Sequence, residues 1–331
     1  MVTFAIYMRI FVYYLHVILL IMEEKFKFTG PKNGYDLDLE ENVNGLSQFH
    51  KKGKEKIEGE FEKTPEQIEM IRTVNQTLIS IFSFLDIKEK RQINVDQVHF
   101  LSDSLFKENC RSNDYGQYNS VSDSISINLE KIGNDKAHLF ATLLHESVHA
   151  VSERHFFADK KDADNTDISD ARVGFRLNSQ WKRKKSILRG FNEFIVNEIV
   201  YYSINKIAKS LEGRFGITKK DLEGSIYSDG VVHQKLIETI YDKLNKNKEV
   251  DESYIAYIAK THFSGSLRIL DPVDKSYGKG SVRVLGCLDM FGDDDIKKDK
   301  VNNMVEEYFL HADEKRKSEI RDILTKITNE N

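Results

Sequence analysis

Residues 143–152 read LLHESVHAVS and contain two histidines four positions apart, with a glutamate directly after the first. In a helix, side chains four positions apart lie on one face, so His145 and His149 can offer their imidazoles to the same metal ion. Zinc is commonly held in this way. Glu146 lies beside them, where it can take a proton from a water molecule that the metal acidifies. The spacing therefore predicts a zinc site with Glu146 as its catalytic base.

The residues around this motif predict a helix. Residues 136–153 contain neither proline nor glycine, and their apolar side chains recur at helical spacing. Asn134 or Asp135 can cap the start of this helix. The alternative is that the two histidines simply lie on a solvated helix face. The mostly apolar surroundings disfavour it, because a solvated face is normally rich in charged residues.

A catalytic zinc ion needs a third protein ligand, and His155 is one candidate. Residues 145–155 read H-E-x-x-H-x-x-S-x-x-H, which nearly matches the metzincin pattern. Ser152 departs from that pattern, which has a glycine there to stop the helix and turn the chain back to the metal. Without glycine the helix could continue and carry His155 away from His149.

Glu193 is the second candidate, in the segment RGFNEFIVNEIVYYSI at residues 189–204. Here the sequence resembles gluzincin metallopeptidases, which bind zinc with HExxH and a glutamate from a later helix, often in an Asn-Glu pair. The gap from His149 to Glu193 is long for thermolysin-like enzymes. It is more similar to gluzincins of the anthrax lethal factor type, in which a sizeable insert separates the two helices.

The surroundings of Glu193 favour it over His155. Gly190 permits a tight start to a new helix, Asn192 can cap it, and the apolar residues that follow give it a buried face. Asn197 occupies a position where gluzincins often carry an acidic residue that orients a zinc-bound histidine. We therefore predict His145, His149 and Glu193 as the zinc ligands.

The resemblance implies a zinc-dependent metallopeptidase that hydrolyses peptide bonds, with Zn²⁺ as cofactor, Glu146 as general base and a peptide or protein as substrate. A metzincin-like peptidase using His155 is one alternative. A zinc hydrolase acting on other bonds and a non-enzymatic, membrane-tethered helical module with an unused motif are two more. The donor that stabilises the oxyanion is not identified by the sequence. The candidates are His233, Tyr254, Tyr257, His262 and Tyr277.

Composition narrows the function further. The chain has 331 residues, 40% hydrophobic and 31% charged, and a net charge of −4, which argues against general nucleic-acid binding. Cys110 and Cys287 form no CxxC motif, so they predict neither a cysteine-based zinc site nor a disulfide framework.

The first 22 residues are almost wholly apolar and close to the minimum length of a membrane span. We predict a membrane anchor there. A signal peptide, a buried segment and a translation start at Met22 are the alternatives, so a cytoplasmic or secreted location stays open. Residues 23–63 are polar, charged and glycine-rich, which predicts a linker.

The remaining chain, residues 64–331, is predicted to form one zincin-like domain of the α+β class. A helix begins at Thr64 with a capping box. Strands at residues 93–101 and 124–128 flank a turn at residues 111–120, which predicts a hairpin whose last strand precedes the HExxH helix. We expect a small antiparallel or mixed sheet packed on the HExxH helix within residues 64–160, followed by a mainly helical part at residues 161–331. The acidic run at residues 159–170 is predicted to be a solvated loop rather than a calcium site.

Overall fold

The structure is a computed structural model that describes residues 27–28, 47–87, 91–110, 113–152, 154–162, 165–173, 176–178, 186–225, 239, 256, 259–260, 262–263, 270–288 and 295–330. Side chains are not described for residues 27–28, 154–187, 271–272, 295–296 and 328–330. The predicted membrane anchor at residues 1–22 lies outside the described residues. Among those that are described, no helix combines the length and the apolar character needed to cross a membrane.

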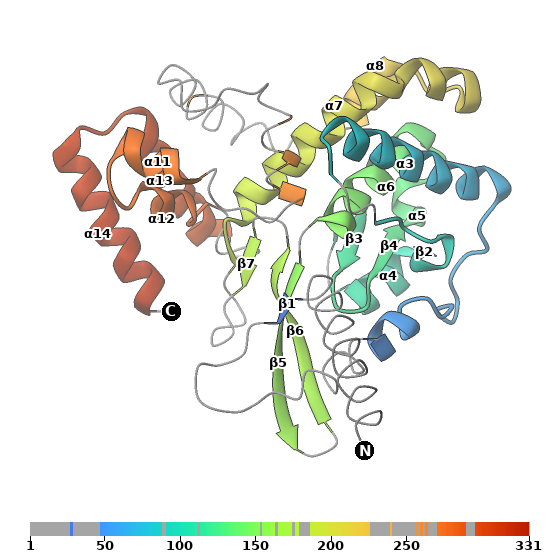
Figure 1. Cartoon of the computed structure of the whole chain (residues 1–331), viewed down its shortest axis with the longest axis horizontal. Coiled ribbons are helices and arrows are strands. Elements are labelled where there is room, and N and C mark those ends of the chain that lie inside the picture. The colour runs from blue at the N-terminus through green and yellow to red at the C-terminus, as the bar shows by residue number, and fades with distance from the viewer. Residues whose placement is uncertain are drawn as a thin grey trace, which may run out of the picture.

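The fold is α+β, as predicted, and its central contact joins helices α6 (Lys136–Val151) and α7 (Arg189–Phe215). A three-stranded sheet and helix α3 (Pro65–Phe84) lie beside α6 (Figure 1). The described helices between residues 271 and 330 gather on the opposite side of the molecule (Figure 1). The part of the chain that carries the HExxH motif is therefore held between a sheet and two helices.

Helix α3 begins where its capping box predicts. The Thr64 side chain accepts the backbone N–H of Gln67 at 3.2 Å, and the Gln67 side chain accepts that of Thr64 at 2.8 Å. Pro65 follows at the first helical position, where its missing N–H costs nothing. The buried face of α3 packs on α6, with Leu78 and Phe82 each 1% exposed.

The three-stranded sheet has the order β2–β4–β3, formed by β2 (Val98–Leu101), β4 (Ser124–Asn128) and β3 (Gly116–Asn119). Strand β4 lies where it is predicted, and Ile125 and Ile127 are buried in the core at 1% and 0% exposure. The parallel partner β2 and the antiparallel partner β3 flank it. The sheet is thus mixed and small, in agreement with the expected class.

The predicted hairpin pairs the wrong strands, because the strand antiparallel to β4 is β3 and not β2. Strand β2 starts only at Val98, after the 3₁₀ turn η1 (Val95–Gln97), and it runs parallel to β4 because α4 (Asp103–Cys110) makes the crossover. The strand that forms the hairpin with β4 is β3, within the segment predicted as a turn. The actual turn is shorter, at residues 120–123, and its Asp123 has a left-handed φ of 57°.

Part of the predicted linker is folded. Residues 53–63 pack on the sheet, where buried His99 bonds the carbonyl of Gly53 at 2.8 Å and the carboxylate of Glu60 at 2.6 Å. The backbone N–H of Phe61 donates to the carbonyl of Phe100 at 2.8 Å. The sheet is therefore covered on the face opposite α6, and Ser124 and Ser126 on that face are also buried.

A second sheet has the order β1–β5–β6–β7–β8, and all of its strands except β1 lie between α6 and α7 in the sequence. Its strands are β1 (Lys27–Phe28), β5 (Arg154–Asp162), β6 (Asn165–Val173), β7 (Arg176–Asn178) and β8 (Ser186–Ile187). The acidic run is predicted to be a solvated loop, but its residues 159–162 and 165–170 lie in strands β5 and β6 of an antiparallel pair, which corrects that prediction. Backbone groups make the ladder, so polar side chains do not prevent it.

All described elements after Ile187 are helices, as predicted for the C-terminal part. After α7 they are α8 (Lys219–Ser225), α11 (Asp271–Tyr277), α12 (Ser281–Leu285), α13 (Asp295–Leu310) and α14 (Glu314–Glu330). The helical part begins at Arg189 rather than at residue 161, because the second sheet occupies the interval. Hydrogen bonds from Leu188 N–H to Gly286 O (3.0 Å) and from Gly190 N–H to Leu288 O (3.4 Å) tie the start of α7 to this part.

Candidate metal centre

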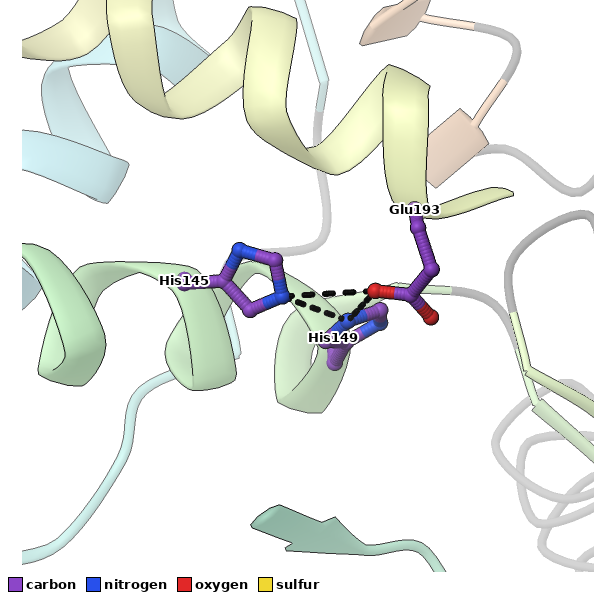
Figure 2. A group of neighbouring side chains, drawn as sticks. All are labelled: His145, His149 and Glu193. Carbon is purple, nitrogen blue, oxygen red and sulfur yellow. Dashed lines mark hydrogen bonds and ion pairs between the residues drawn. The ribbon is translucent and has the colours of Figure 1, made fainter. Parts of the chain in front are cut away.

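The two histidines of the motif project from α6 toward one point. The helix begins at Lys136, where Asp135 is the cap and accepts the N–H of His138 at 2.9 Å. Phe140, Leu144 and Val148 hold the helix in the core, each at 0% exposure. The buried residues fix the orientation of α6 and of the helix face that carries the two histidines. On that face the Nε2 atoms of His145 and His149 lie 3.2 Å apart (Figure 2).

Glu193 reaches the same point from α7. Its Oε2 atom lies 3.2 Å from Nε2 of His149 and 3.4 Å from Nε2 of His145 (Figure 2). The packing of α7 on α6 places it there, since Phe194 and Ile195, the two residues that follow Glu193, are 3% and 0% exposed. The structure thus brings together the three side chains that the sequence predicts as ligands.

The distances among the three ligand atoms match the size of a zinc ion. In a tetrahedral site with bonds of about 2.05 Å, two ligand atoms lie about 3.3 Å apart. The observed separations are 3.2, 3.2 and 3.4 Å. Two imidazole nitrogens and one carboxylate oxygen are also donor atoms that zinc accepts, and they leave a fourth position for water. The residues present therefore fit a zinc ion.

Two asparagines of α7 lie near the histidine rings. The amide of Asn192, which is 1% exposed, lies 3.5 Å from Nδ1 of His149. The atom of Asn192 nearest Nδ1 of His149 is the amide nitrogen Nδ2. A histidine that gives Nε2 to a metal carries its proton on Nδ1, so Asn192 would have to flip its side-chain amide to accept that proton with its oxygen. Asn197 lies one turn after Glu193 and contributes to the raised pKa of His145, after larger effects from burial, Glu193 and Glu146. Its amide oxygen is buried and makes no hydrogen bond among the described residues, so its predicted role in orienting a histidine stays a prediction.

The start of α7 differs from the prediction. The helix begins at Arg189 after Leu188, whose left-handed φ of 62° turns the chain, and Asn192 lies inside the first turn. Asn192 is therefore not the cap. Its buried side chain points instead to His149, which explains why an asparagine precedes Glu193.

The charges of the site stabilise one another. Burial would raise the pKa of Glu193, but the charges of both histidines and their hydrogen bonds outweigh it and hold the pKa well below its usual value. Burial would lower the pKa of His145, but hydrogen bonding to Glu193 and the charges of Glu146 and Glu193 raise it. Glu193 is therefore a carboxylate near neutral pH, as a metal ligand must be.

Glu146 lies beside the ligands and faces strand β3. It is 8% exposed, and its Oε2 accepts the backbone N–H of Tyr118 at 2.8 Å. Burial raises the pKa of Glu146, although the charges of His145 and His149 and the bond from Tyr118 act in the opposite direction. A raised pKa suits a group that must take up and release a proton. The contact with β3 is absent from the sequence prediction, because Gly116 and Tyr118 lie in the segment read as a turn.

The environment of Ser152 corrects one step of the argument about His155. The helix ends at Val151 without glycine, because the hydroxyl and the N–H of Ser152 both bond the carbonyl of His149, at 2.6 and 3.2 Å. His155 then lies in β5, where its backbone pairs with Lys27 and Arg172. The side chain of His155 lies outside what the structure describes.

The residues that the sequence offers as donors to the oxyanion lie in different parts of the chain. His233, Tyr254 and Tyr257 lie outside the described residues. His262 is fully buried against Phe263, and the hydroxyl of Tyr277 donates to the carbonyl of Thr239 at 3.3 Å, away from the metal ligands. Cys110 and Cys287 form no disulfide. None of these contacts identifies a donor for an oxyanion.

Comparisons with protein-family models, with curated proteins and with solved structures find no match to this chain.

Proposed function

We propose that this protein is a zinc-dependent metallopeptidase whose catalytic domain is zincin-like and of the gluzincin type. The convergence of His145, His149 and Glu193 from two helices, at the separations that a tetrahedral ion requires, carries the proposal. The resemblance of the HExxH and Asn-Glu segments to gluzincins adds the reaction class. The membrane anchor at residues 1–22 is a further part of the proposal, and it rests on the sequence alone.

In this proposal each residue has a defined task. His145, His149 and Glu193 would hold Zn²⁺, which supplies Lewis acidity and a water molecule of lowered pKa. Glu146 takes the proton of that water as it attacks a carbonyl carbon, and then returns the proton to the leaving amine nitrogen. Burial of the Glu146 carboxyl, which raises its pKa, favours this exchange in both directions.

Strand β3 supports a peptide as the substrate. The N–H of Asn128 donates to the carbonyl of Tyr115 at 2.8 Å, so the alternation of an antiparallel ladder turns the N–H and C=O groups of Gly116 and Tyr118 away from β4. Because Tyr118 N–H reaches Glu146, this edge faces the candidate metal centre. An extended peptide can pair with such an edge through its own backbone.

Two measurements on the purified chain test the proposal. Metal analysis should find one zinc ion per folded chain, removable by a chelator. A peptide library should be cleaved by the wild-type chain and left intact by Glu146→Gln. A folded chain with no zinc would refute the metal site, and a zinc-loaded chain that cleaves no peptide would refute the reaction class.

A further inference from the structure

Strand β3 approaches helix α6 more closely at Gly116 than a side chain would allow. A Cβ atom built on Gly116 would lie 2.6 Å from Cγ2 of Thr142, 3.0 Å from Cγ of Glu146 and 3.3 Å from Oε1 of Glu146. Non-bonded carbon atoms normally lie about 3.5–4.0 Å apart. A side chain at position 116 would therefore push the strand away from the helix or displace the side chains of Thr142 and Glu146.

The same short stretch of β3 holds the carboxylate of Glu146. Two residues after Gly116, the N–H of Tyr118 points away from β4 and donates to Oε2 of Glu146 at 2.8 Å. That bond is possible only while the strand stays close to the helix. The absence of a side chain at Gly116 and the bond from Tyr118 are thus two parts of one contact.

Strand β3 is also anchored, so it cannot easily shift to make room. The hydroxyl of Tyr118 donates to Oδ1 of Asp123 at 3.0 Å, and Asp123 forms an ion pair with Arg91. Arg91 also donates to the carbonyl of Ala150, the residue after His149. The strand and the last turn of α6 are therefore linked through Arg91.

We propose that Gly116 is a positioning residue for the hydrolysis: its missing side chain lets β3 hold the Glu146 carboxylate through the N–H of Tyr118, in the orientation that proton transfer needs. The inference rests on the proposed function, since it assigns Glu146 the task of the base. It adds a requirement that the HExxH motif does not contain, namely a glycine on the neighbouring strand.

Gly116→Ala tests this inference, with Gly213→Ala as the matched control. Gly213 lies within α7, and an added Cβ there meets nothing within 4 Å. In Gly116→Ala we expect kcat to fall by about 10–100-fold, the cost of a small misplacement of a catalytic group. Zinc content should stay within twofold of wild type, because the three predicted ligands lie on α6 and α7. Gly213→Ala should keep the wild-type kcat.

Amide hydrogen exchange at Tyr118, followed by NMR, reads the contact without any substrate. The Tyr118 N–H should be protected in the wild-type chain and exchange faster in Gly116→Ala, approaching its rate in Glu146→Ala. A purely structural defect would instead loosen amides throughout α6 and the three-stranded sheet. Unchanged protection of Tyr118 together with a wild-type kcat in Gly116→Ala would overturn the inference.

A double variant distinguishes the effect of Gly116→Ala on Glu146 from its effect on Thr142, the other neighbour of Gly116. Thr142→Ser removes Cγ2, so in Gly116→Ala/Thr142→Ser the new methyl group loses its nearest contact and still meets Cγ and Oε1 of Glu146. The double variant should still have a lower kcat than Thr142→Ser, and it carries the test if Gly116→Ala does not fold. Equal kcat values for these two chains would overturn the inference. If the wild-type chain binds no zinc or cleaves no peptide, the proposed function is refuted instead. The exchange rate of the Tyr118 N–H would still show whether the contact with Glu146 forms.

Discussion

Oε2 of Glu193 lies 3.2 Å from Nε2 of His149, although 44 positions separate the two residues in the chain. The contact depends on α7 crossing α6, and the second sheet fills the interval between the two helices. The carboxylate and the imidazole lie within hydrogen-bonding distance of each other, and both can offer an atom to a shared metal ion. Glu193 is thus placed to complete the proposed zinc shell.

Replacing Glu193 should weaken zinc binding strongly. We expect Glu193→Ala to lower zinc affinity by well over tenfold, because loss of a direct ligand should cost more than the roughly 10–100-fold lost with supporting residues. Competition with a chromophoric chelator measures the affinity. His155→Ala, as the control, should leave it nearly unchanged. A large loss in His155→Ala with none in Glu193→Ala would instead favour the metzincin-like alternative.

Glu146→Gln should separate metal binding from catalysis. Glutamine keeps the size of the side chain and can still accept the N–H of Tyr118, but it cannot take up a proton at neutral pH. Zinc content and the thermal unfolding midpoint should match wild type, while peptide cleavage should fall below detection. Retained turnover in this variant would show that another group is the base.

The local parts of the site could be predicted because short-range rules determine them. The capping box at Thr64 and the spacing of His145 and His149 each involve residues within one helical turn. The Asn-Glu pair pointed to Glu193 only through the family resemblance. The helix contact that brings Glu193 to the histidines is a property of tertiary packing.

The missed parts have identifiable physical reasons. Strand β3 contains Gly116 and Asn119, residue types that favour turns, and the sheet and helix α6 override that preference. The hairpin β5–β6 is rich in charged residues, so its composition resembles a loop while its backbone forms a ladder. Ser152 ends α6 with its hydroxyl, a capping role that a search for glycine overlooks.

The stability of the metal-free protein should depend on pH through Glu193 and His145. The pKa of His145 is raised in the folded protein. Its contribution to the free energy of unfolding is therefore fully present below its ordinary pKa of 6.5, and it is lost as the pH rises through the raised pKa. The pKa of Glu193 is lowered in the folded protein. Its contribution to the free energy of unfolding is therefore present above its ordinary pKa of 4.5, and it is lost as the pH falls through the lowered pKa. The pair therefore stabilises the fold most between pH 4.5 and 6.5.

Urea unfolding in the presence of a chelator measures this dependence. The free energy of unfolding of wild type should exceed that of Glu193→Gln by the largest amount in the window from pH 4.5 to 6.5. The difference should shrink at higher pH, as His145 loses its proton. A difference that grows steadily above neutral pH would contradict the assigned ion pair.

The hydrogen bond between Glu60 and His99 should contribute to the stability of the domain, so that residues 53–63 are needed for the full free energy of unfolding. His99 is 2% exposed, with one ring nitrogen 2.6 Å from the Glu60 carboxylate and the other 2.8 Å from the carbonyl of Gly53. Glu60→Ala leaves one of these buried nitrogens without its partner, which costs about 1–3 kcal/mol of unfolding free energy. Glu62→Ala is the matched control, because Glu62 is exposed and pairs only with Lys56 across the surface.

Truncation tests the same contact on a larger scale. A chain that starts at residue 23 should keep the fold and the zinc affinity of the full chain, since the residues around His99 remain. A chain that starts at residue 64 should unfold at lower urea concentration, because it uncovers His99 and removes the bond from Phe61 to Phe100. Zinc binding in the folded fraction should persist in both, as the ligands lie on the far side of the sheet from this segment. Equal stability of the two truncated chains, or a stable Glu60→Ala variant, would show that residues 53–63 are a linker after all.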